Sequence, residues 1–141
     1  MKKIFAPGND SLTTSIALLI LRLWIGLTMM LHHGLDKIEH FNDYSGKFVN
    51  FLGIGQPASL SLTIFAEFFC SALLVLGLAT RFGALVLAIN MSVAFIMVHK
   101  LALSGPMPGE PAFVYLAIYV TVLVAGAGKF SLDKIIFGKG K

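Results

Sequence analysis

The stretch SIALLILRLWIGLTMMLHHGLDKI, residues 15–38, decides the fold. The apolar run from Leu12 to Leu31 has the length of about 20 residues that a membrane-spanning helix needs. It is too long for the apolar core of a cleaved signal peptide, so we interpret it as a retained first span. Arg22 lies well inside this run, and the pair His32–His33 follows ten residues later. The role of these polar side chains is the main question that the sequence raises.

The composition indicates an integral membrane protein that contacts the lipid bilayer. Hydrophobic residues make up 57% of the 141 residues and charged residues only 13%, whereas a soluble domain has about 25% charged residues. The basic residues do not cluster on a polar face, which argues against nucleic-acid binding. Cys70 is the only cysteine, so the chain has no disulfide or redox dithiol of its own.

Four apolar segments predict an all-α fold, a four-transmembrane-helix bundle that forms one domain over residues 1–141. We expect these helices at approximately 13–33, 60–78, 82–99 and 111–128. The link 34–59 is the longest. Within it, Phe41, Tyr44, Phe48, Phe51 and Leu52 recur at helical spacing, which predicts a short amphipathic helix on the membrane surface or over the mouth of the bundle.

The distribution of Lys and Arg predicts the orientation, because short cytoplasmic flanks carry an excess of these residues. One side of the bundle would carry seven and the other three, which places both termini in the cytoplasm and the long first link outside. The seven are Lys2, Lys3, Arg81, Lys129, Lys134, Lys139 and Lys141, and the three are Lys37, Lys47 and Lys100.

Arg22 and Glu67 are the two clearest ionisable residues inside predicted spans, and such residues indicate function by default. Their estimated depths leave the two charged groups about 10 Å apart or more, so a direct ion pair is one option among several. Arg22 could also extend toward the inner headgroups, join helices as a hydrogen-bond hub, or face a ligand. Glu67 has closer partners in His33 and, beyond it, Lys37.

Helical spacing places the other polar residues of the spans near Glu67 and predicts a polar pocket that enters the bundle from outside. An acid beside histidines can accept or relay a proton. The alternative is a polar network between helices that binds no ligand. The candidate residues are Glu67, His33, His32, His99, Tyr115, Tyr119, Glu110 and Lys37, with Arg22 and Asn90 toward the floor.

The histidine spacing argues against a metal or haem site. His32 and His33 are adjacent and point about 100° apart on a helix, and the i, i+4 pair used for metals is absent. His33 and His99 could bracket a haem, but interfacial histidines are more often solvated. At the end of the fourth span, Gly126 and Gly128 loosen the helix, and Ser131 is expected to cap a further short helix.

Three stretches resemble the DoxX family of small four-helix membrane proteins: LRLWIGLTMMLHHGLDKI, AEFFCSALLVLGLATRFGALVLAINMSVA and GEPAFVYLAIYVTVLVAGAGKFSLDKII. The likeness covers nearly the whole chain in the right order. The matching residues are Arg22, Gly26, His33, Gly34, Lys37, Glu67, Gly77, Arg81, Glu110, Gly126, Gly128, Ser131, Leu132 and Asp133.

This resemblance implies a protein of the bacterial cytoplasmic (inner) membrane, with a quinone-linked or redox-accessory role. The family takes its name from a membrane subunit of a thiosulfate:quinone oxidoreductase, so any catalysis would belong to a subunit of a quinone-dependent oxidoreductase. The chain has no flavin or nicotinamide fingerprint and no iron–sulfur cysteines. We therefore expect no intrinsic cofactor, with a bound quinone or a partner subunit supplying the redox chemistry.

Two other classes of function stay open. A non-enzymatic assembly or scaffold partner fits the small size and the polar contacts between helices. A carrier for a small solute fits an arginine inside the membrane, and it would need a homo-oligomer because four short helices enclose little space.

Overall fold

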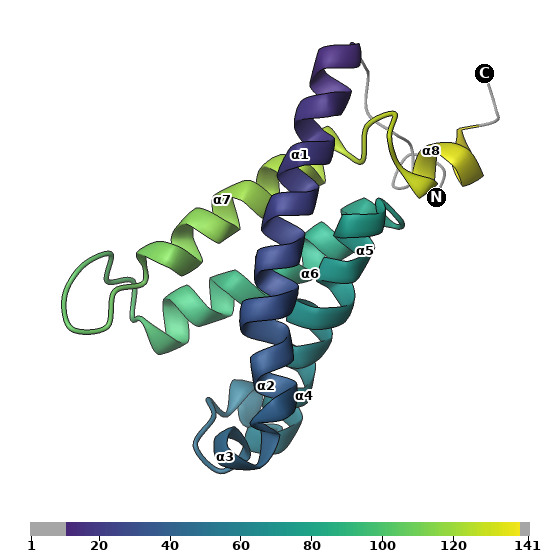
Figure 1. Cartoon of the computed structure of the whole chain (residues 1–141). Helices are drawn as coiled ribbons and strands as arrows, with labels where there is room; N and C mark the ends of the chain where they lie inside the picture. The colour runs from purple at the N-terminus through teal and green to yellow at the C-terminus, as the bar shows by residue number, and fades with distance from the viewer. Residues whose placement is uncertain (1–10, 139–141) are drawn as a thin grey trace.

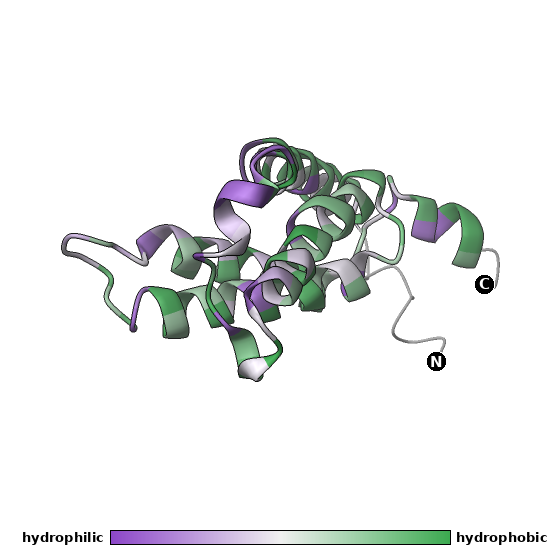
Figure 2. Ribbon diagram, turned by 90° about the horizontal axis from the view of Figure 1, so that it is seen from below, coloured by the Kyte–Doolittle hydropathy of each residue, from purple (hydrophilic) through white to green (hydrophobic). Residues whose placement is uncertain are grey.

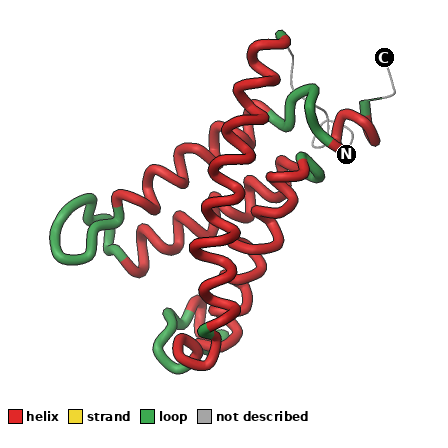
Figure 3. Tube along the Cα trace, viewed as in Figure 1, coloured by secondary structure: helices red, strands yellow, loops and turns green. Residues whose placement is uncertain are grey.

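Helices make up most of the computed structural model, which describes residues 11–138, and no strand occurs in that range (Figure 3). The all-helical expectation is therefore confirmed for these residues. The predicted anchors Lys2, Lys3, Lys139 and Lys141 lie outside the described residues. The links between the long helices gather at the ends of the molecule, which leaves the helix faces to form the interior.

The first long helix runs without interruption for 28 residues, from Leu12 to Glu39. It consists of α1 (Leu12–Thr28), a π-helical segment η1 (Met29–Gly34) and α2 (Leu35–Glu39). The Ser11 side chain caps its start by accepting a hydrogen bond from the Thr14 amide. Its end lies six residues beyond the expected limit because Gly34 keeps ordinary helical angles (φ −68°, ψ −49°), and this extension carries Lys37 on the helix.

The second and third long helices form the expected hairpin. The second consists of α4 (Gln56–Ile64), the π-helical segment η3 (Phe65–Cys70) and α5 (Ser71–Leu76), and the third of α6 (Thr80–Val93) and η4 (Ala94–Val98). Gly77 ends the second helix in the left-handed region at φ 68°, as is common at helix ends. These two helices and the first are long and apolar enough to cross a membrane.

The fourth apolar helix, α7 (Glu110–Ala125), has 16 residues and is shorter than expected. It stops at Gly126, whose angles (φ 84°, ψ −166°) are open to glycine and strained for other residues. The short helix α8 (Leu132–Phe137) follows, and the Ser131 hydroxyl accepts a hydrogen bond from the Lys134 amide at 3.2 Å. The predicted Ser131 cap is therefore confirmed.

The short helix predicted in the first link is confirmed only in part, because it is shorter than the apolar spacing indicated. Only α3 (Phe41–Ser45) and one 3-10 turn, η2 (Phe51–Gly53), form there. Gly46 ends α3, and the chain then turns through Leu52 and Gly53, which both have positive φ. The turn directs Phe48 and Phe51 toward the space between the helices, as expected for a segment over the mouth of the bundle, whereas Tyr44, Leu52 and Ile54 stay exposed.

The long helices are arranged as two crossed pairs. In the first pair α1 packs on α5 and η1 on η3, and in the second α6 packs along α7. Figure 1 shows the α6–α7 pair running obliquely to the first pair, with the link before α7 and the α2–α3 corner at separate ends of the molecule. Figure 2 shows hydrophobic residues along the helix bodies. The pairs meet near α5 and diverge toward those two corners.

A clasp of polar contacts holds the pairs together at the end where they meet; we call Arg22, Gly77, Ser131 and Asp133 the Arg22 clasp. The Arg22 side chain is fully buried and donates hydrogen bonds to the carbonyl oxygens of Leu74 at 3.0 Å and Phe130 at 2.6 Å. The Asp133 carboxylate accepts from the backbone amides at the start of α6, at 2.7 and 2.9 Å. The clasp thus satisfies helix-end groups that would otherwise be buried without partners.

Candidate ligand cavity

A cavity of about 520 Å³ lies in the wedge where the two helix pairs diverge. Its volume falls in the range of roughly 300–1,000 Å³ that is usual for small-molecule sites. Most of its wall is apolar, with a few polar groups gathered on one side. Its lining includes Met29, His33, Lys37, Phe48, Phe51, Leu62, Phe65, Glu67, Val86, Ile89, Asn90, His99 and Tyr115.

Three side chains from three different helices meet at the polar side of this cavity; we call Glu67, Lys37 and Asn90 the Glu67 cluster. The Lys37 ammonium donates to Glu67 Oε2 at 2.7 Å, and the Asn90 amide donates to Glu67 Oε1 at 3.1 Å. The Glu67 side chain is 6% exposed and that of Lys37 18%. Each carboxylate oxygen therefore has one donor, in a place that excludes most water.

The local backbone explains how the carboxylate reaches both donors. Glu67 lies in η3 and His33 in η1, and these two π-helical segments pack against each other. π-Helical turns are rare and are frequent at functional sites. Gly34 makes the contact possible, because a Cβ at this position would lie 2.8 Å from the carbonyl carbon of Glu67 and the amide nitrogen of Phe68.

Substitution of Gly34 by alanine is expected to destabilise the fold by about 2 kcal/mol, because the added methyl group meets backbone atoms that cannot move aside. The variant should also weaken the Lys37–Glu67 contact, since η1 must move away from η3. Unfolding by SDS titration in mixed micelles measures the change. Gly46→Ala is the control, because a Cβ there meets nothing within 4 Å, and equal losses for the two variants would contradict this account.

His33 and two tyrosines form an aromatic wall beside the Glu67 cluster. The rings of His33 and Tyr115 meet edge to face with their centroids 5.8 Å apart, and Tyr115 stacks on Tyr119 at 6.1 Å. Tyr115 lines the cavity, whereas Tyr119 is buried below it among the core side chains. The wall therefore presents one flat aromatic ring and one imidazole to a ligand.

His99 and the first link close the opposite side. His99 Nδ1 lies 3.2 Å from the Met107 carbonyl oxygen, which ties the end of the third helix to the link before α7. The Ser59 hydroxyl accepts from the Phe51 amide at 2.9 Å and donates to the Gly55 carbonyl at 2.7 Å. These contacts hold the side chains of the link against the cavity.

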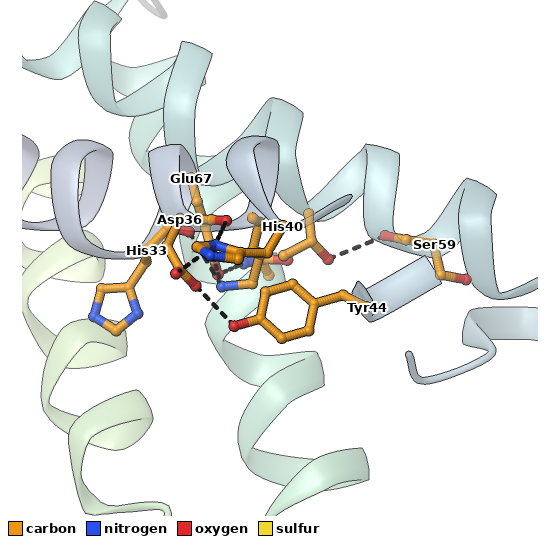
Figure 4. A network of polar contacts seen from close by, with 9 residues as sticks. His33, Asp36, His40, Tyr44, Ser59 and Glu67 are labelled. Carbon is orange, nitrogen blue, oxygen red and sulfur yellow. Dashed lines mark hydrogen bonds and ion pairs between the residues drawn. The ribbon is translucent and has the colours of Figure 1, made fainter. Parts of the chain in front are cut away.

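A second polar network marks the corner between α2 and α3. The Tyr44 hydroxyl donates to Asp36 Oδ2 at 3.1 Å, and His40 Nδ1 lies 3.1 Å from Asp36 Oδ1 (Figure 4). The hydrogen bond to the Asp36 backbone, aided by nearby carboxylates, raises the pKa of His40, and the hydrogen bond to the Asp36 carboxylate raises the pKa of Tyr44. This corner fixes the direction in which the first link leaves the helix, next to Lys37.

Four of the expected pocket residues do not line the cavity. Arg22 belongs to the Arg22 clasp, so its assignment to the pocket floor is wrong, and among the described residues Glu67 pairs with Lys37 instead of Arg22. His32 faces outward, because its neighbour His33 takes the inward direction on the helix. Tyr119 is fully buried beneath Tyr115. Glu110 is exposed and lines a smaller cavity of about 280 Å³ between α1 and α7.

The other six candidates lie around the cavity as expected. Sequence reasoning missed part of the lining, notably Met29, Phe48 and Phe51. The apolar spacing of the first link did mark the two phenylalanines, but a surface helix explained the same spacing.

In residues 11–138, no three His, Cys, Asp or Glu side chains are grouped as metal ligands. The absence of a metal site or haem stays a prediction.

Comparison with known proteins identifies the family. The model of the DoxX family matches residues 17–100, which include all three members of the Glu67 cluster. The chain belongs to the DoxX family. It is also 34% identical over 91 residues to an uncharacterized protein of Haemophilus influenzae, a match that covers 61% of this chain and 67% of that protein. No solved structure matches the chain.

Nine of the fourteen residues by which the sequence resembles the DoxX family fall into two groups in space. One group builds the Arg22 clasp: besides its four members, Gly128 lies against Ser15 and Leu18 of α1. The other group, His33, Lys37 and Glu67, lines the cavity, and Gly34 allows the close packing behind it. In this DoxX protein the shared pattern therefore marks one structural junction and one candidate ligand site.

Proposed function

We propose that this DoxX protein binds a lipid-soluble quinone in the cavity and serves as a quinone-linked or redox-accessory subunit. The observation that carries the proposal is the Glu67 cluster, which places two hydrogen-bond donors and one carboxylate at the edge of an otherwise apolar cavity. A quinone has a flat ring with carbonyl oxygens at opposite edges and an apolar tail. The shape and polarity of a quinone therefore match the mostly apolar walls of the cavity and the polar groups of the Glu67 cluster.

The lining residues fit such a group. The Lys37 ammonium and the Asn90 amide could donate to a carbonyl oxygen, and Tyr115 would offer an aromatic ring for contact with the quinone. Met29, Leu62 and Phe65 supply apolar contact for the ring and tail. When bound, a quinone would supply a carrier of two electrons and two protons, which this chain lacks.

The chain's own residues would bind and orient the ring and handle protons. Lys37 holds its positive charge next to the carbonyl oxygen, where hydrogen bonds from charged donors are strongest. Glu67 lies beside both donors and can accept or give up a proton. Electrons would come from an oxidoreductase partner subunit, because no redox-active group is encoded in the chain.

Orientation and assembly belong to the same proposal. The lysine and arginine distribution supports a multi-pass protein of the cytoplasmic membrane with both termini inside and the cavity on the outer side. The proposal treats residues 1–141 as one domain.

Trp24 supports a protein partner or a second copy of the chain. Its side chain is 75% exposed near the middle of the first helix, whereas a tryptophan that contacts lipid is favoured at the membrane interface.

Removal of the Lys37 charge is expected to weaken quinone binding at least tenfold, because a hydrogen bond to a charged group contributes about 1.5–3 kcal/mol. Isothermal titration of the purified protein in nanodiscs with a decyl-chain benzoquinone compares wild type with Lys37→Met. Lys47→Met is the matched control, since Lys47 is exposed in the first link and lies outside the cavity. No binding by wild type, or equal affinity of Lys37→Met, would rule the proposal out.

A further inference from the structure

The Glu67 cluster is balanced in donors and acceptors only while Glu67 is ionised. The two carboxylate oxygens then accept one hydrogen bond each, from Lys37 and Asn90. The charges of Lys37 and Glu67 also cancel at a separation of 2.7 Å. In this state each carboxylate oxygen has a donor and the charge of Lys37 is paired, so an acceptor brought by a ligand gains less here than beside an unpaired ammonium.

Protonation of Glu67 reverses this balance. The neutral carboxyl gains an O–H donor and keeps only part of its acceptor capacity, so the ammonium of Lys37, the amide of Asn90 and the O–H of Glu67 then share fewer and weaker acceptors. Buried donors without acceptors are costly, and the positive charge of Lys37 is then unpaired. An oxygen acceptor brought by a ligand would restore the hydrogen bonds.

We propose that Glu67 makes occupancy of this cavity proton-linked: a quinone is bound together with one proton on Glu67, whereas the corresponding quinol is bound to ionised Glu67. The inference rests on the proposed quinone site. A quinone head has only acceptors and cannot displace a carboxylate from an ammonium, so it selects the protonated form. A quinol has two O–H donors and can donate to the carboxylate. No bond or electron moves in this step; one proton passes from solvent to Glu67.

Few other titratable groups face Glu67. His33 and Lys37 approach from the first helix, Asn90 from α6, and Tyr115 and Tyr119 from α7. The tyrosines are neutral at physiological pH. His33 is therefore the one other group in this set that could take up the proton, and the experiment has to separate it from Glu67.

Isothermal titration in buffers of different ionisation enthalpy measures how many protons the protein takes up for each ligand molecule bound. Where free wild type holds the Lys37–Glu67 ion pair, it should take up about one proton for each decyl-chain benzoquinone bound, and the dissociation constant should rise about tenfold per pH unit. The reduced, quinol form of the same compound should bind with close to zero uptake. The quinone-to-quinol affinity ratio should therefore fall as the pH rises.

Three variants assign the proton. Glu67→Gln should bind quinone with close to zero uptake and no pH slope, whereas His33→Gln and the exposed-site control Glu39→Gln should keep the wild-type uptake. Loss of the uptake in His33→Gln, or its retention in Glu67→Gln, would overturn the assignment to Glu67. If Glu67→Gln does not fold, wild type and His33→Gln still decide the question.

The two proposals fail in different ways. Binding of quinone by wild type without proton uptake would remove the linkage and leave the quinone site in place. Failure of both the quinone and the quinol to bind would remove the site and, with it, the linkage.

Discussion

Replacement of Arg22 by methionine is expected to lower the free energy of unfolding by about 3 kcal/mol. The substitution keeps a long apolar stem but removes two hydrogen bonds, one to the buried carbonyl oxygen of Leu74 and one to the partly buried carbonyl oxygen of Phe130. Each carbonyl left without a donor costs about 1–3 kcal/mol. Methionine also avoids the free energy that burial of the positive charge costs, which offsets part of this loss. We therefore expect a net loss between the two extremes. The effect should be on stability first, because Arg22 does not line the cavity.

SDS-induced unfolding in mixed micelles measures this loss, with Arg81→Met as the matched control. Arg81 Nη2 also donates to a carbonyl oxygen, that of Val124, at 3.2 Å, but at an exposed position. We expect a change below about 1 kcal/mol there. Equal losses for the two arginines would mean that the Arg22 clasp does not hold the helix pairs together. In micelles that keep Arg22→Met folded, its affinity for the benzoquinone should stay within about twofold of wild type.

Removal of either charge of the Lys37–Glu67 pair is expected to cost more than removal of both. Glu67→Leu leaves a largely buried ammonium without its partner, and the loss of one partner of a buried pair typically costs about 3–5 kcal/mol. The lower end of this range applies, because the Lys37 side chain keeps 18% of its surface exposed. Lys37→Met should behave similarly, since it leaves a buried carboxylate without its partner.

The double variant Lys37→Met/Glu67→Leu tests this pairing by a double-mutant cycle. Its loss of stability should be smaller than either single loss, and so at least about 3 kcal/mol below their sum, because an apolar pair can replace a buried ion pair at little cost. Additive losses would show that the two groups do not interact in the folded protein. The same cycle with Lys47→Met in place of Lys37→Met should be additive.

Much of the fold was predictable because the bilayer imposes simple rules. Segments of about 20 apolar residues must be helices in lipid, and glycine ends them where the angles demand it, as at Gly77 and Gly126. The Ser131 cap followed from a local motif. The first link was not predictable, because its aromatic spacing fits a surface helix as well as a turn that points Phe48 and Phe51 inward.

The positions of candidate site residues were predictable where these residues share one face of a single helix. His33 and Lys37 are four residues apart on the first helix, and this spacing placed both near Glu67. The position of Arg22 could not be derived in the same way, since its partners are backbone carbonyls, and one of them, in Phe130, comes from the far end of the chain. The sequence shows which side chains need a hydrogen-bond partner. It does not show which backbone carbonyl will accept, because every residue has one.

The shortness of α7 has a consequence for the surrounding lipid. Sixteen residues extend about 24 Å, whereas the hydrocarbon core of a typical bilayer is about 30 Å thick. If α7 crosses the bilayer, the bilayer has to thin locally around it. This deformation would lie beside the wedge that holds the cavity. The other long helices have 19–28 residues, so lipid headgroups would come closer to the cavity on the flank of α7 than elsewhere around the bundle.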